Sequence, residues 1–153
     1  MDLPLALNIA TTVAVVGGVI FGAWQIRVAA KARATQVSLQ LVEMLYSREL
    51  AEGMTALLDL PEGLSWAELQ ARLGERWTAV FTLINTLDGL GILVFRKEVA
   101  FEVADDFFRY AVMNVWEKTR AAILERRQRL GRDNFRFLQW LAEAQAKRSV
   151  QRG

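Results

Sequence analysis

The chain has no cysteine and no histidine, and only two of its 153 residues are proline. The missing side chains exclude disulfides, Ser–His and Cys–His nucleophile pairs, and the usual ligands of zinc. No glycine-rich loop of the Walker or dinucleotide type is present either. We therefore expect a protein that is not an enzyme, with no catalytic residue, no metal and no cofactor.

Charge is absent from Leu3 to Ile26. A helix of this length crosses a hydrocarbon core of about 30 Å, so we predict a single span at about residues 3–26, within an anchor formed by residues 1–33. The alternative is a signal peptide cleaved among the small residues at 29–34. Such peptides begin with positive charge and have a shorter apolar core, which favours the anchor.

Three basic residues follow the apolar stretch directly: Arg27, Lys31 and Arg33. The positive-inside rule then places the N-terminus outside and residues 34–153 in the cytoplasm, on the inner membrane. Zero cysteines agree with a reducing compartment. Together with Trp24, an aromatic anchor, the three cations are expected at the membrane interface.

Glycine is concentrated in the span as a GxxxG pair, Gly18 and Gly22. This spacing lets two membrane helices approach closely, and Thr11 lies on the same small and polar face. One interpretation is a helix–helix contact along Thr11, Gly18 and Gly22. The other is a chance pattern that faces lipid.

The remaining residues, 34–153, show helical patterns separated by few breaks. Ser65 and Glu68 match a capping box, and the apolar helix that follows is expected to weaken at Gly74 and to close at 88–91. Residues 92–95 are then a buried connector. An earlier helix, continuing from the span, is expected to stop at Gly53.

The longest helical pattern runs from Val99 to Leu130, with Gly131 as its end. Trp116 shares its apolar face and is expected to be mostly buried. A last helix follows, capped by Asp133 or Asn134. The predicted fold is all-α, with one transmembrane helix followed by a small cytoplasmic helical bundle.

A resemblance rests on three segments: residues 85–94 (NTLDGLGILV), residues 116–118 (WEK), and the aromatic and apolar residues from Phe135 to Glu143. Their order resembles an uncharacterised bacterial family, a domain of unknown function with one N-terminal span and a cytoplasmic helical domain. The resemblance covers nearly the whole chain. It implies no activity and no catalytic residue.

Charged residues cluster twice. Four acids, Glu98, Glu102, Asp105 and Asp106, lie near the start of the longest helix. They either hold a hard cation or complement the helix dipole, and the second interpretation is favoured. Six arginines follow on or near the same helix: Arg120, Arg126, Arg127, Arg129, Arg132 and Arg136. They form either a solvated face or a contact for anionic lipid headgroups or an acidic protein surface. Nucleic acid is not expected as a partner.

Tryptophan is abundant, with five residues in the chain. Trp66, beside a turn, and Trp140, near the C-terminus, are expected to be partly exposed. Because tryptophan and arginine are common anchors at interfaces, we predict docking through Trp66, Trp140, Arg126, Arg127 and Arg129.

The favoured function is a non-catalytic accessory or structural subunit of a larger integral-membrane complex, for example a photosynthetic or respiratory one. Its partners would be integral-membrane subunits and the lipid bilayer. The alternative is a self-associating membrane-anchored adaptor or sensor that uses the GxxxG helix.

Overall fold

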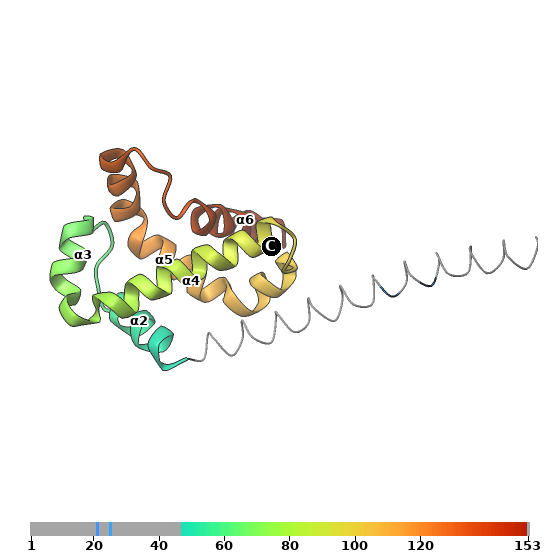
Figure 1. Cartoon of the computed structure of the whole chain (residues 1–153), viewed down its shortest axis with the longest axis horizontal. Coiled ribbons are helices and arrows are strands. Elements are labelled where there is room, and N and C mark those ends of the chain that lie inside the picture. Colours follow the sequence, from blue (N-terminus) through green and yellow to red (C-terminus); the bar gives the residue numbers. More distant parts are fainter. Residues whose placement is uncertain (1–20, 22–24, 26–46, 153) are drawn as a thin grey trace, which may run out of the picture. The chain divides into compact units, whose positions relative to one another are not determined.

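The computed structural model describes residues 47–152, together with Phe21 and Gln25. The chain divides into two units, residues 1–37 and 38–153, and every helix discussed below belongs to the second (Figure 1). The predicted span lies outside the described residues. So do the predicted packing residues, Thr11, Gly18 and Gly22, and the predicted interface residues, Trp24, Arg27, Lys31 and Arg33. These stay predictions.

The described part of the second unit is helical, with no strand between residues 47 and 152. Its elements are α2 (Arg48–Leu58), α3 (Trp66–Leu73), the 3₁₀ turn η1 (Gly74–Arg76), α4 (Trp77–Phe95), α5 (Phe101–Leu130) and α6 (Arg136–Arg152). Helix α4 packs against α2 and α6, and also contacts α5 (Figure 1). The predicted all-α class is confirmed.

The core is built around α4, because its side chains are apolar on nearly every face. The buried residues of this helix are Val80, Leu83, Ile84, Leu87, Leu90 and Val94. Helix α5 covers them with one apolar stripe: Phe108, Val112, Val115 and Ile123. Trp116 flanks this stripe and is mostly buried, as expected.

One helical run of the described part, Trp66–Phe95, is long and apolar enough to cross a membrane. A buried core helix passes the same test of length and composition. The α4 portion of this run packs on α2, α5 and α6, so the bundle core accounts for its apolar character. This run is not the segment predicted as the span, residues 3–26.

Two glycines permit close helix packing. A Cβ on Gly91 would lie 2.5 Å from the backbone oxygen of Phe137, and one on Gly53 would lie 2.6 Å from that of Ala79. Gly53 is therefore inside α2, where α4 touches it, and the prediction that it ends a helix was wrong.

Helix α4 also continues past the predicted end at 88–91, so residues 92–95 are its last turn rather than a connector. It ends at Phe95, and Lys97, the residue after its C-cap Arg96, has a left-handed φ of 62°. The backbone N–H of Lys97 donates to the oxygen of Val94, and that of Glu98 donates to Leu93. These two bonds form a Schellman motif with lysine in the position usually taken by glycine.

Helix α5 ends as predicted at Gly131, which is left-handed. The predicted cap of the last helix was wrong: neither Asp133 nor Asn134 fills this role. Instead the Asp88 carboxylate, from the middle of α4, accepts the backbone N–H groups of Phe137 and Leu138 at 3.0 and 2.9 Å. Asp88 thus joins α4 to the N-terminus of α6 while neutralising that helix end.

The capping box of α3 is confirmed and makes stability depend on pH. Glu68 accepts hydrogen bonds from the backbone N–H and the hydroxyl of Ser65, and these two bonds hold the pKa of the Glu68 carboxyl below its usual value. A lowered folded pKa means that the bonds stabilise the fold above the unfolded pKa, and that this contribution is lost as the pH falls through the folded pKa.

We therefore expect the stability difference between wild type and Glu68→Gln to shrink on acidification below about pH 4.3, the ordinary glutamate pKa. Urea unfolding of both proteins from neutral to acidic pH measures it. Glu62→Gln, at an exposed position in the preceding turn, is the control. A difference that stays constant with pH would contradict the assignment.

Candidate docking surfaces

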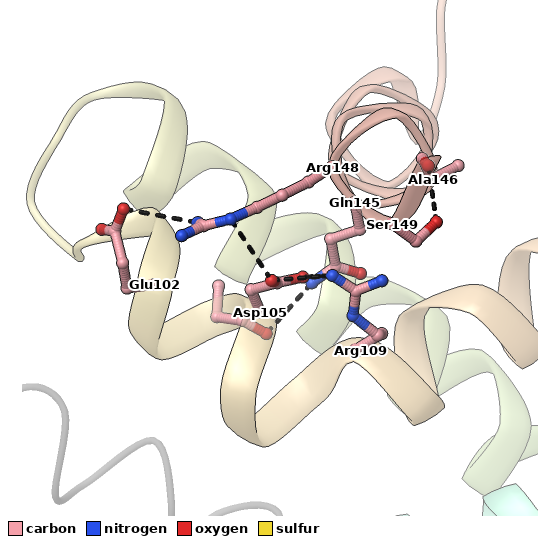
Figure 2. A network of polar contacts seen from close by, with 8 residues as sticks. Glu102, Asp105, Arg109, Gln145, Ala146, Arg148 and Ser149 are labelled. Atoms are coloured by element: carbon pink, nitrogen blue, oxygen red, sulfur yellow. Dashed lines mark hydrogen bonds and ion pairs between the residues drawn. The ribbon is translucent and has the colours of Figure 1, made fainter. Parts of the chain in front are cut away.

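One member of the acidic cluster at the start of α5, Asp105, is buried and used for internal packing, while Glu98, Glu102 and Asp106 are exposed. Asp105 is only 3% exposed, and its carboxylate accepts a hydrogen bond from Arg109 at 2.7 Å (Figure 2). Arg148 of α6 lies 3.8 Å from the same carboxylate, and it also forms an ion pair with the carboxylate of Glu102 at 3.3 Å. Within the described residues no group of three or more potential ligands could hold a metal ion. Asp105 instead ties α5 to the C-terminal half of α6.

Two of the predicted docking arginines also have internal roles. The Arg126 guanidinium lies over the ring of Trp66, 4.3 Å from its centroid. Arg127 donates from Nε to the backbone oxygen of Asn134 at 2.7 Å and from Nη1 to the side chain of Gln139 at 2.6 Å. Arg127, which lies on α5, therefore ties both the α5–α6 loop and the first part of α6 to α5. Arg129 is exposed and remains available for docking.

Trp66 is 3% exposed, so the expectation of partial exposure was wrong for this residue. Its ring meets Trp77 edge to face at 5.0 Å and stacks on Phe135 at 6.2 Å. The backbone N–H of Trp66 donates to the Glu125 carboxylate at 3.0 Å. Trp66 is thus a structural residue that joins α3 to α5.

Trp140 is half-buried, as expected, and belongs to a surface cluster that we name the aromatic–arginine patch: Phe95, Arg136, Phe137 and Trp140. The Phe95 ring meets Trp140 at 5.3 Å and Phe137 at 5.4 Å, both edge to face. Arg136 lies over the Phe137 ring at 4.6 Å. These four residues line a groove of about 280 Å³, and Phe95 is 56% exposed.

A second surface feature is the exposed aromatic pair, Phe107 and Tyr110 of α5, which are 60% and 67% exposed. Their spacing of three places them on one face of the helix. Sequence reasoning missed them. Helical phase could have found Phe107. It is adjacent to Phe108 of the buried stripe, and neighbouring residues of a helix point in different directions, so Phe107 points away from that stripe.

Comparison with known proteins gives a family and no activity. No curated protein and no solved structure matched the chain. A family model, that of a domain of unknown function (DUF4760), matches residues 12–145. The predicted resemblance to an uncharacterised domain family is confirmed. The chain belongs to the DUF4760 family.

Proposed function

We propose that this chain is a non-catalytic accessory subunit of a larger integral-membrane complex, for example a photosynthetic or respiratory one. One span within residues 1–33 anchors it, and its helical domain docks on integral-membrane subunits. The observation that carries the docking is the exposed aromatic pair. Two large aromatic rings on one helix face, both more than half exposed, are typical of a surface that a protein partner covers.

The use of the charged side chains supports a non-catalytic role. Asp88 caps α6, Asp105 pairs with arginines, and Glu125 accepts from the backbone of Trp66. Lys118 donates to the backbone oxygen of Leu60 at 2.6 Å. These groups hold elements together, whereas a general acid or base must be free to reach a substrate.

The pair is tested by purifying the tagged full chain from native membranes in mild detergent. We expect the double variant Phe107→Ala, Tyr110→Ala to lose stoichiometric partners while keeping its helical circular dichroism and unfolding midpoint. Leu124→Ala is the matched control, since Leu124 is a 42% exposed apolar residue on the same helix. Recovery of wild type as a free monomer would contradict the proposed function, and partner loss in Leu124→Ala would contradict the assigned surface.

The alternative, a self-associating adaptor or sensor, depends on Gly18 and Gly22. Isoleucine at both positions would keep the helices apart. If the chain self-associates through this pair, a membrane-association assay should show dimers in wild type and none in the Gly18→Ile, Gly22→Ile variant. Equal association in both would remove the alternative.

A further inference from the structure

We infer that the aromatic–arginine patch binds the anionic headgroup layer of a bilayer and lays the helical domain flat on the membrane surface. This inference rests on the proposed function in one respect, the predicted anchor. It concerns a different surface from the exposed aromatic pair, which is the proposed contact for protein partners.

The first argument is the composition of the patch. Phe95, Phe137 and Trp140 line one groove together with Arg136, whose guanidinium lies over the Phe137 ring. Aromatic rings and arginine are the side chains that favour the boundary between headgroups and acyl chains. Rings insert to a small depth there, while a guanidinium binds phosphate oxygens above them.

The second argument is the charge around the groove. Arg96 and Lys97 follow Phe95 directly at the exposed end of α4. On α6, Lys147 shares a helical face with the patch, because it follows Trp140 by two turns.

Four carboxylates lie near these cations: Glu98, Glu143, Asp88 and Asp133. Two of them already have partners within the domain, since Asp88 accepts the backbone N–H groups of Phe137 and Leu138, and Asp133 lies 3.4 Å from Nε of Arg127. The four cations of the patch and its surroundings therefore outnumber the two remaining carboxylates, Glu98 and Glu143, and the patch complements an anionic surface.

The third argument is proximity. A domain that follows a span within the same chain meets the membrane surface at high effective concentration. Each basic residue near an anionic surface adds about 1 kcal/mol, so several weak contacts suffice when the domain is already tethered. An acidic protein surface satisfies the same charges, but it explains the cluster of aromatic rings less directly.

The absence of cysteine makes the test specific, because one introduced cysteine carries one dye. We place it at Val150→Cys, which is 82% exposed, changes no charge and lies on the face of α6 that carries Arg136 and Trp140. Ala67→Cys, exposed on α3, is the control label. The full chain is reconstituted in phosphatidylcholine bilayers, with or without phosphatidylglycerol, that contain a headgroup nitroxide quencher.

We expect quenching of the Val150→Cys dye, and not of the Ala67→Cys dye, to increase when phosphatidylglycerol is present. Arg136→Ala should lower the contact equilibrium about fivefold, the effect of one basic residue at an anionic surface. The matched control Arg129→Ala, at another exposed arginine, should leave it unchanged. Likewise Phe95→Ala should reduce quenching and Phe107→Ala should not.

Equal quenching in the two bilayers, or none in either, would overturn the inference. Protection of the dye only in native membranes, sensitive to Arg136→Ala, would assign the patch to an acidic protein instead. If the chain bound vesicles only when they were anionic and was released by salt, the predicted anchor would fail while the patch assignment stood. Loss of protein partners in Phe107→Ala, Tyr110→Ala is measured separately, so the two proposals fail independently.

Discussion

Gly91→Ala should destabilise the domain by about 3 kcal/mol, as expected for overpacking at a tight helix contact. The added Cβ would lie 2.5 Å from the oxygen and 2.7 Å from the carbonyl carbon of Phe137, both backbone atoms. No side-chain rotation relieves this clash. Helix α6 has to move away from α4, which also lengthens the hydrogen bonds from Phe137 and Leu138 to Asp88. Urea unfolding monitored by circular dichroism measures the loss.

Gly89→Ala, two residues away, is the matched control and should act in the opposite direction. Outside its chain neighbours and the backbone of its own helix, no atom lies within 4 Å of the Cβ position at Gly89. Alanine in an open helix interior stabilises by about 0.5–1 kcal/mol relative to glycine. Equal effects of the two substitutions would show that α4 and α6 do not approach closely at Gly91.

These two glycines also explain why the end of α4 was mispredicted. Residues 88–91 contain the acid and glycines that usually close a helix, and the sequence shows no glycine at 96–100. The structure uses the same residues for tertiary contacts: Asp88 caps α6, and Gly91 has no Cβ that would prevent the close approach of the α6 backbone. Lys97 takes the left-handed position instead. Contacts with residues 46 or more positions away therefore decide where α4 ends. A short segment of sequence around residues 88–91 does not contain those partners.

Three signals that are complete within a few residues were predicted correctly. The Ser65–Glu68 capping box, the break at Gly74 and the end of α5 at Gly131 depend on neighbouring residues only. The predicted docking residues depend on tertiary packing, and docking itself stays a prediction. Trp66 is buried with the Arg126 guanidinium over its ring, whereas Trp140 lies in a surface patch.

The exposed aromatic pair was missed for a related reason. Helical phase separates Phe107 from the apolar stripe of α5, but phase alone does not say whether another element covers a second face. Five helices pack in the described domain, and Phe107 and Tyr110 stay exposed there. Only the arrangement of the helices shows that this second face of α5 stays exposed.

Asp105→Ala should destabilise the domain by about 2 kcal/mol, because it removes a buried charged acceptor from its hydrogen bond with the half-buried Arg109. The carboxylate also approaches Arg148 of α6, so α5 and α6 lose one of their polar links. Gln145 stays buried beside it and donates to the backbone oxygen of Ala104 at 3.0 Å. We expect the largest increase in amide hydrogen exchange in the second half of α6, with the part capped by Asp88 affected less.

Asp106→Ala is the matched control. The Asp106 side chain is exposed, and this substitution removes the same charge from the same region of α5. Its effect should stay within about 0.5 kcal/mol, as for most surface substitutions. Asp105→Asn separates charge from shape: it keeps the volume and one acceptor, so it should cost less than alanine but more than Asp106→Ala. If both alanine variants had the same small effect, complementing the helix dipole would account for the acidic cluster, and Asp105 would not hold α6 in place. If Asp105→Ala alone loosens the end of α6, dye contact at position 150 should also weaken, because the second half of α6, which carries Lys147 and position 150, is then held less firmly against α5.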